Sequence, residues 1–464
     1  MNVLTRFFVA ILVLGASVPI AQAGGYDTPM LYSARHMGVG GAAAGYVDDP
    51  SALYHNPAGL AHTESLSLMI NVSPLGGYIE GAPAPNTQAQ SETTFAPFFL
   101  LGANYRINDW MTVGLALFPV ASAGAEYQYE SAGASIVDRT KLVFYEATPG
   151  FGFNLPGNLR LGVGYRITYM TLERFQGNDM AAGLDFELSG LNAASFRVGL
   201  QWTPIEDEAG ADGTNRNELQ IGSSYRHRTD LTIENDSGKA LFEFTDISSE
   251  FVLPAKFNLG ARYDTGRLGF VSDFEYTLQS QNESSSLAGT DPSGMFREVA
   301  NIFGWQDSIT VRVGGEYRLG EQGEMAVRAG YAYDGLVSNS SYPTAFGTPP
   351  APTHVFTAGA GYEAENWELN FAIAHRRGDA TVTADNVAAG DLGFCAFCSS
   401  PGDYRIRLLA AYIDFSYEFG GDDEAAHEEE DLEEESAEIE PPAGSSADSA
   451  IEELTEDVQV ADQV

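Results

Sequence analysis

Apolar and polar residues alternate one by one through most of this chain. Between residues 159 and 169 the odd positions hold Leu, Val, Tyr and Ile, whereas the even positions hold Arg, Gly and Thr. The same alternation marks residues 256–264, 309–319 and 412–419. A period of two over segments of about ten residues is typical of strands that face lipid on one side and a lumen on the other.

The alternation predicts fourteen strands. We expect them at residues 64–74, 95–107, 110–120, 139–155, 159–172, 190–203, 217–231, 252–265, 267–279, 308–319, 325–334, 353–363, 367–378 and 403–419.

Short and long connections alternate between these strands. Tight turns are expected at residues 108–109, 156–158, 266, 320–324 and 364–366, and residues 204–216 form a longer acidic exception. The other seven connections are long and rich in Ser, Gly, Asn and Pro. Outer-membrane barrels have short turns on the periplasmic side and long loops outside. The sequence therefore predicts an all-β fold, a 14-stranded antiparallel transmembrane barrel at residues 63–419 with both ends in the periplasm.

A soluble β-sandwich would also have short alternating strands. It would not explain the regular change between short and long connections, or aromatic residues at strand ends. Such residues suit the interfacial girdles of a membrane barrel, and they are Trp110, Tyr127, Tyr169, Tyr263, Trp367 and Phe419.

The two ends of the chain differ from the body. Residues 1–23 predict a secretory signal peptide, with Arg6, an apolar run at 7–14 and the cleavage site Ala21-Gln22-Ala23. Residues 420–464 hold 18 of the 64 acidic residues and no Lys or Arg, which predicts a disordered periplasmic tail. The tail is either simply solvated or binds a periplasmic partner. The chain has no basic patch, so nucleic acid is not an expected partner.

Residues 24–62 are rich in Gly and Ala and have no clean period. A barrel of fourteen strands is wide enough to leave a lumen, and this segment could fill it as an N-terminal plug, or hatch. A disordered leader would fit the glycine content, but it would not explain Met30, Leu31, Tyr32, Leu53, Tyr54 and Leu60.

The chain carries little that suggests catalysis. The seven histidines are scattered without the spacing of a helical metal site, and no nucleophile motif is present, so we expect neither an enzyme nor a metal or other cofactor. In an exported chain Cys395 and Cys398 are expected to form a disulfide, with a redox motif or half a metal site as alternatives.

The inward positions of the strands suggest what the lumen holds. If odd positions of the first strands face lipid, six apolar side chains point inward: Phe98, Leu100, Phe118, Leu142, Phe144 and Leu408. A water-filled porin needs a polar lumen, so these residues indicate a hydrophobic ligand, or else they pack against the hatch. Pro119 interrupts the third strand and removes a ladder hydrogen bond, as either a bulge or a break in the wall.

The N-terminal segment resembles the outer-membrane long-chain fatty acid transporters, the FadL family. The resemblance rests on Ser33-Ala34-Arg35, on residues 38–42 and on residues 48–60, where Asn56-Pro57-Ala58 is the most specific signal. Later stretches at 253–263, 305–317, 328–334 and 354–362 look similar. Barrels of this kind usually end on an aromatic residue of the last strand, and the barrel-assembly machinery is an expected partner. One departure is that Phe419 is followed here by the acidic tail.

The resemblance implies passive uptake of long-chain fatty acids or other hydrophobic compounds across the outer membrane. We expect Asn56, Pro57 and Ala58 to anchor the hatch, and a side opening at Pro119 to release substrate into the membrane lipid. The alternative is a structural or adhesive barrel that binds a partner through its long loops or acidic tail.

Overall fold

The computed structural model describes residue 25 and residues 32–131, 133–178, 181–206, 217–240, 242–347, 350–393 and 395–420. The expected signal peptide and almost the whole acidic tail therefore lie outside the described residues, as do Met30, Leu31 and Phe394.

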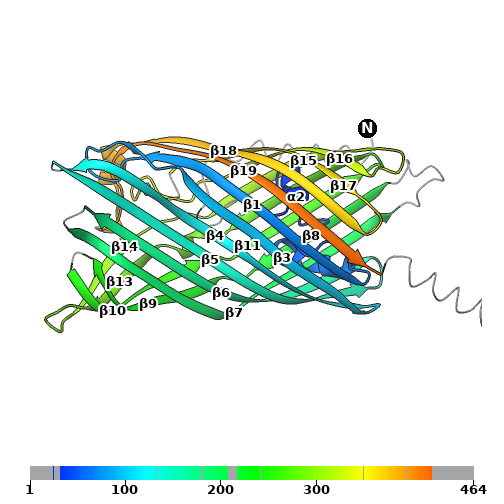
Figure 1. Ribbon diagram of the computed structural model, residues 1–464, viewed down its shortest axis with the longest axis horizontal. Coiled ribbons are helices and arrows are strands. Elements are labelled where there is room, and N and C mark those ends of the chain that lie inside the picture. Colours follow the sequence, from blue (N-terminus) through cyan, green and yellow to red (C-terminus); the bar gives the residue numbers. More distant parts are fainter. Residues whose placement is uncertain are drawn as a thin grey trace, which may run out of the picture. The chain divides into compact units, whose positions relative to one another are not determined.

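In the described part of the chain, nineteen strand segments form one antiparallel sheet (Figure 1). The first eight are β1 (Leu66–Gly81), β2 (Ala89–Gln90), β3 (Thr94–Asn108), β4 (Met111–Ser131), β5 (Ala134–Leu155), β6 (Leu159–Gly177), β7 (Ala182–Glu206) and β8 (Glu218–Arg226). The next six are β9 (Thr229–Ala240), β10 (Phe242–Leu253), β11 (Lys256–Asp264), β12 (Leu268–Thr277), β13 (Ser284–Thr290) and β14 (Phe296–Ile302). The last five are β15 (Ser308–Leu319), β16 (Met325–Asp334), β17 (Thr353–Glu363), β18 (Trp367–Val382) and β19 (Gly402–Phe419).

The sheet closes on itself as a barrel of fourteen strands. The pairs β8 with β9, β10 with β11, β12 with β13, and β14 with β15 each run on as one interrupted wall strand, and β2 is only two residues long. When β2 is set aside and each of these four pairs is counted as one strand, the nineteen segments make fourteen wall strands. Closure comes from β1, which pairs with β19 on one side and with β3 on the other.

The strands run further into the long connections than the sequence indicates. β4 and β5 continue until Ser131 pairs with Ala134, and β7 begins at Ala182 rather than near residue 190. The connections before β5 and β7 are thus mostly strand, because alternation continues there with polar instead of apolar outward residues.

On β4, β5 and β6 the outer face carries an apolar band that ends at neighbouring positions of the three strands. On β4 the exposed outward residues are Leu115 and Leu117, whereas beyond Pro119 the outward positions hold Ser122, Gly124 and Glu126. On β5 and β6 the band ends at Tyr145 and Tyr169, each about two-fifths exposed. Apolar side chains bounded by aromatic residues are typical of the lipid-facing surface of a barrel.

Tyr127 does not belong to this band. The expectation that it lies in an interfacial girdle is wrong, because Tyr127 is fully buried and donates a hydrogen bond to the Ala345 carbonyl oxygen (2.7 Å). The register between β4 and β5 shifts between Pro119 and Ala121. A one-residue bulge turns every following side chain to the opposite face, so Tyr127 points inward.

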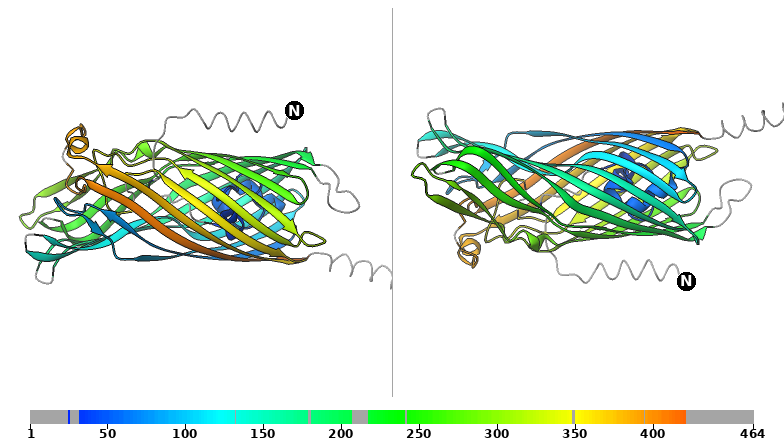
Figure 2. Two further views of the ribbon diagram at one scale, coloured as in Figure 1. Left: turned by 90° about the horizontal axis from the view of Figure 1, so that it is seen from above. Right: turned by 90° about the horizontal axis from the view of Figure 1, so that it is seen from below.

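The hatch lies inside the barrel, nearer the end at which β19 finishes (Figure 2). It contains three short helical segments, α2 (Ala34–Gly38), α3 (Ala52–His55) and the 3₁₀ helix η1 (Pro57–His62). Among the described residues, no helix is long and apolar enough to cross a membrane.

Candidate functional site

Three kinds of side chain follow one another along the inner face of the wall. On β5 the inward residues are Leu142, Phe144, Glu146, Thr148, Gly150 and Gly152. On β6 they are Leu172, Met170, Thr168, Arg166, Gly164 and Gly162. Because Phe144 pairs with Met170 and Gly150 pairs with Gly164, like residues lie side by side. We call the three zones the apolar layer, the charged layer and the glycine layer.

The glycine layer allows the hatch to touch the backbone of the wall. A Cβ at Gly162 would overlap Pro57, and a Cβ at Gly199 would overlap the side-chain oxygen of Asn56. On the opposite wall, a Cβ at Gly314 would overlap the Val39 carbonyl. Only glycine leaves room for so close an approach, so the wall fits this hatch on several sides.

Asn56, Pro57 and Ala58 lie buried at this contact. Asn56 donates from Nδ2 to the carbonyls of Ala44 (2.7 Å) in the hatch and Leu200 (3.0 Å) in β7. Its Oδ1 accepts the Ala58 N–H (3.2 Å) and so caps η1, which Pro57 begins. The Asn56 side chain therefore connects two parts of the hatch to the wall.

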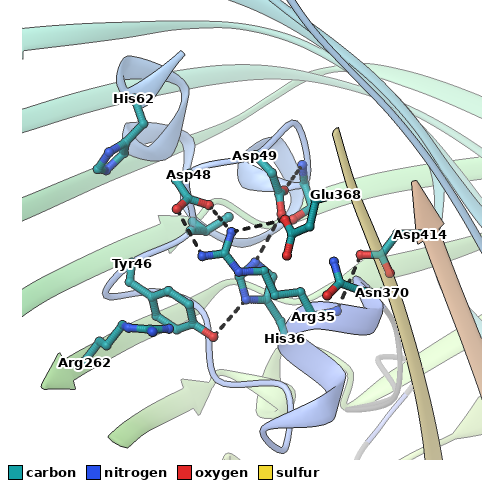
Figure 3. A network of polar contacts seen from close by, with 12 residues as sticks. Arg35, His36, Tyr46, Asp48, Asp49, His62, Arg262, Glu368, Asn370 and Asp414 are labelled. Atoms are coloured by element: carbon teal, nitrogen blue, oxygen red, sulfur yellow. Dashed lines mark hydrogen bonds and ion pairs between the residues drawn. The ribbon is translucent and has the colours of Figure 1, made fainter. Parts of the chain in front are cut away.

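Charged and polar contacts hold the other side of the hatch (Figure 3). Arg35 forms an ion pair with Asp48 (2.6 Å) and lies 3.8 Å from Glu368 of β18. The Asp414 carboxylate of β19 accepts the N–H of Ala34 (2.8 Å) at the start of α2. Tyr46 lies beneath the Arg262 guanidinium, 4.7 Å from the ring centre to Cζ. The hatch is thus bonded to β7, β18 and β19 by side chains as well as by packing.

Two histidines of the hatch have a lowered pKa. Burial, together with the nearby Arg160 guanidinium, lowers the pKa of His62 to about 4. Burial and the neighbouring His36 lower the pKa of His55 well below its usual value. Each has a polar partner, since His62 Nε2 lies 3.0 Å from Gln201 Oε1 and His55 Nε2 lies 2.5 Å from the Tyr32 carbonyl oxygen.

The charged layer lies between the hatch and the apolar layer. Glu146, which is almost fully buried, binds Arg166 (2.7 Å) and Arg197 (2.9 Å). Further round the wall, Glu275 binds Lys256 (3.1 Å) and Arg312 (3.4 Å). Arg197, Lys256, Glu275 and Arg312 line a polar cavity of about 580 Å³, some of it open to solvent, together with hatch residues Tyr32, Met37 and Tyr54.

The apolar layer surrounds a second cavity, which we call the aromatic cavity. Its empty volume is about 910 Å³, part of it continuous with solvent. Seven of the twenty lining residues are aromatic: Phe186, Phe251, Phe303, Trp305, Tyr342, Phe346 and Phe397. Concave, mostly apolar sites with a few polar groups are typical of binding sites for small molecules.

The six predicted lumen residues divide between this cavity and the packed interior. Leu142 lines the aromatic cavity. Phe98, Leu100, Phe118 and Phe144 are buried in the main hydrophobic cluster, and Leu408 packs against it half-buried. Phe118 lies against hatch residues Tyr32 and Tyr54, with ring centres 5.9 and 5.4 Å away. Leu142 therefore faces an open part of the lumen, whereas Phe118 packs against the hatch.

Cys395 and Cys398 are joined in a disulfide with a Cα–Cα distance of 5.5 Å. Both sulfurs lie near the Ile302 carbonyl oxygen, at 3.6 and 3.5 Å, and Phe397 and Cys398 line the aromatic cavity. The disulfide thus belongs to a loop at the edge of this cavity.

The wall is interrupted at Pro119. The ladder between β3 and β4 ends at the pair Leu101 and Leu117. Within residues 94–100 and 118–131, all of them described, no ladder pairing joins the two strands, because β3 continues along β1 and β4 along β5. Further on, the Glu92 N–H donates to the Glu126 carbonyl (2.8 Å). From inside, the Tyr32 hydroxyl donates to the Pro119 carbonyl (2.8 Å).

The sequence does not reveal which charged residues pair in the charged layer. Glu146, Arg166 and Arg197 lie on three different strands and come together only through the registers of β5, β6 and β7. A weak signal exists, since each is a charged residue at an inward position of an otherwise alternating strand. The loop residues of the aromatic cavity have no such signal, because no period places residues 303–305 or 342–346.

A closed antiparallel barrel, an apolar outer band and a hatch in the lumen define the protein as an integral β-barrel of the outer membrane. The sequence profile of a family described as outer membrane protein transport protein (OMPP1/FadL/TodX) matches residues 14–396, and the chain belongs to this family. No curated protein matches the sequence significantly.

Solved structures of the same fold include transporters. A FadL homologue from Pseudomonas aeruginosa is 17% identical, covers 86% of this chain and 100% of its own length, and has a TM-score of 0.66. The toluene transporter TbuX from Ralstonia pickettii is 15% identical over 85% of this chain and 100% of its own, with a TM-score of 0.61. The toluene transporter TodX from Pseudomonas putida is 17% identical over 85% and 100%, with a TM-score of 0.62. These likenesses establish the fold, and the family establishes a role in the transport of hydrophobic compounds.

Proposed function

We propose that this protein carries long-chain fatty acids or other hydrophobic compounds, such as the toluene of TbuX and TodX, passively across the outer membrane. The compound enters the aromatic cavity from the end with long connections, which faces the outside of the cell. It leaves sideways past Pro119 into the hydrocarbon region of the membrane.

The observation that carries this proposal is the position of the wall interruption at Pro119 along the barrel axis. An apolar molecule that moves along the barrel axis next meets the charged layer and then the hatch. Entry of apolar groups among buried ion pairs is unfavourable, because the ions would lose their polar surroundings. Pro119 lies where the apolar layer gives way to the charged layer, since Phe118 pairs with Glu146 and Ala121 with Phe144. On the outer face the apolar band also ends there, so the opening connects two apolar regions.

An uncovered break in a strand is costly inside a membrane unless protein satisfies the free backbone groups. The Tyr32 hydroxyl supplies one such hydrogen bond, to Pro119. The hatch therefore covers the opening from inside, and movement of Tyr32 would uncover it.

The experiment is a disulfide across the opening. Cysteines replace Phe99 of β3 and Pro119 of β4, which lie two residues beyond the last ladder pair, Leu101 and Leu117. The background is Cys395→Ser/Cys398→Ser, and uptake of radiolabelled oleate and toluene by intact cells is compared before and after reduction. We expect uptake to stop in the oxidised form while binding to the purified protein persists. The reduced form controls for the loss of proline, and a crosslink at Tyr105 and Val113, far from the opening, should change nothing. Full uptake through the verified Phe99–Pro119 crosslink would exclude the lateral route.

A further inference from the structure

The aromatic cavity contains one charged side chain among its lining residues, Arg174 of β6. Its other polar lining groups are neutral hydroxyls and one amide, from Thr140, Ser249, Ser285, Asn301, Tyr342 and Thr344. The state of Arg174 therefore decides whether the cavity attracts an anion.

Arg174 is already neutralised. Its Nη1 donates to the Asp138 carboxylate of β5 and to the carbonyls of Arg139 (3.1 Å) and Phe175 (2.9 Å). Its Cζ lies 4.9 Å from the centre of the Phe346 ring. The side chains of Arg174 and Asp138 are 11% and 1% exposed, so water screens their pairing little.

Asp138 lies behind Arg174 and is held in place by other groups. It accepts hydrogen bonds from Gln176 Nε2 (2.7 Å) and the Tyr129 hydroxyl (3.0 Å). It is not among the residues that line the cavity. Asp138 thus acts on a ligand only through Arg174 and the net charge of the cavity wall.

A carboxylate that enters this cavity would lose its hydration and find no unoccupied cation among the lining residues. It would have to compete with Asp138 for Arg174, and its own charge would lie near that of Asp138, which is unfavourable in a low dielectric. A neutral ring meets no such penalty, and seven aromatic side chains offer stacked and edge-to-face contacts.

We propose that Asp138 is a specificity-determining residue that sets the aromatic cavity to take neutral aromatic molecules in preference to carboxylates. The inference rests on the proposed function, in which this cavity holds the transported compound. It chooses between the two substrate classes that the proposed function leaves open.

The test compares ligands of one shape that differ in charge. Binding of radiolabelled toluene, benzamide and benzoate to the full-length protein in amphipol is measured by equilibrium dialysis at pH 7.5, with protein-free amphipol as the blank. We expect both neutral ligands to bind at least about tenfold more tightly than benzoate, which is the effect of one moderate charge interaction. This arm needs no variant, so it does not depend on whether a mutant folds.

The second arm reverses the preference. Asp138→Asn keeps the shape of the side chain and releases the Arg174 charge, so benzoate affinity should rise about tenfold while toluene affinity stays within about twofold. Asp334→Asn is the matched control, because Asp334 also binds a buried arginine, Arg376 (3.0 Å), and lies outside the cavity lining. It should leave the ratio of benzoate to toluene affinity unchanged.

The fluorescence of Trp305 tests whether the ligand binds in the aromatic cavity. It lines the cavity, whereas Trp110, Trp202 and Trp367 are 55%, 45% and 37% exposed on the outer face. Bound toluene should therefore alter tryptophan emission in the native protein and not in Trp305→Phe. If neither toluene nor oleate bound, the cavity would be refuted as the transport site and with it the proposed function. Oleate that binds where toluene does not would overturn only the preference for neutral aromatic molecules. Equal binding of toluene, benzamide and benzoate, or an Asp138→Asn variant that changes toluene and benzoate alike, would overturn the role of Asp138 alone.

Discussion

The two halves of the barrel use the same strands to do different things. In the half that holds the hatch, the inward residues of β5 are Gly150 and Gly152, and the hatch packs onto the wall itself. In the half with the aromatic cavity, the inward residues of the same strand are Leu142 and Phe144. The two halves alternate equally well, so alternation determines only which side chains point inward. The size and charge of those inward residues determine whether a section of lumen is filled or left open.

The boundary between the halves should be the most sensitive place. Glu146→Gln removes the carboxylate that Arg166 and Arg197 share and leaves two buried guanidiniums with one negative charge fewer. Removing one partner of a buried ion pair typically costs about 3–5 kcal/mol. We expect a loss of this size in the free energy of unfolding, measured by urea titration in lipid vesicles. Lys141→Gln, which affects only an exposed pair with Glu173, should cost less than about 1 kcal/mol. An equal loss in both variants would show that the charged layer has no special role.

The glycine layer permits a comparison between adjacent residues. Gly314 faces the hatch, where a Cβ would overlap the Val39 carbonyl, whereas the Cβ of an alanine at Gly315 would lie 3.7 Å from the nearest neighbour. Gly314→Ala should destabilise the protein by about 1–3 kcal/mol, as overpacking does, and Gly315→Ala by less than about 0.5 kcal/mol. Thermal unfolding followed by the gel mobility of the folded barrel distinguishes them. Similar losses of stability in the two variants would mean that the hatch shifts to accommodate the added methyl group at little cost.

Much of this architecture could be predicted from the sequence, and the errors have a common cause. The fourteen strands are confirmed, because each repeats the lipid–lumen alternation over enough residues. The predicted outward orientation of Tyr127 is wrong, because the bulge after Pro119 changes which residues of that strand point inward. The proline alone does not reveal how many residues the bulge inserts. The partnership of Arg174 with Asp138 could not be predicted, since it depends on the register between β5 and β6. Periodicity reports the face of a residue but not its neighbour on the next strand.

A smaller effect is expected where the hatch meets β7. Asn56→Ala removes two hydrogen bonds donated to Ala44 and Leu200 and the cap of η1. Loss of a cap or a buried hydrogen bond typically costs about 1–2 kcal/mol. Hydrogen exchange should accelerate in the hatch amides and remain unchanged in β5 and β6. Acceleration throughout the barrel would show instead that the hatch and wall unfold together.

The smallest effect is one of pH, and it again separates the hatch from the cavity half. Burial, with the charge of Arg160 nearby, lowers the pKa of His62 to about 4, against about 6.5 in an unfolded chain. Since the folded form favours the neutral ring, its stabilising contribution is present above pH 6.5 and is lost as the pH falls from about 6.5 to about 4. Between pH 7 and pH 6 this linkage amounts to only about 0.7 kcal/mol.

Hydrogen exchange of the η1 amides should therefore accelerate about threefold over this range, after correction for the intrinsic pH dependence of exchange. In His62→Gln, which does not titrate and still offers Gln201 a hydrogen-bond partner, the acceleration should disappear. If His62→Gln retained it in full, another group in the hatch, with His55 the first candidate, would be responsible.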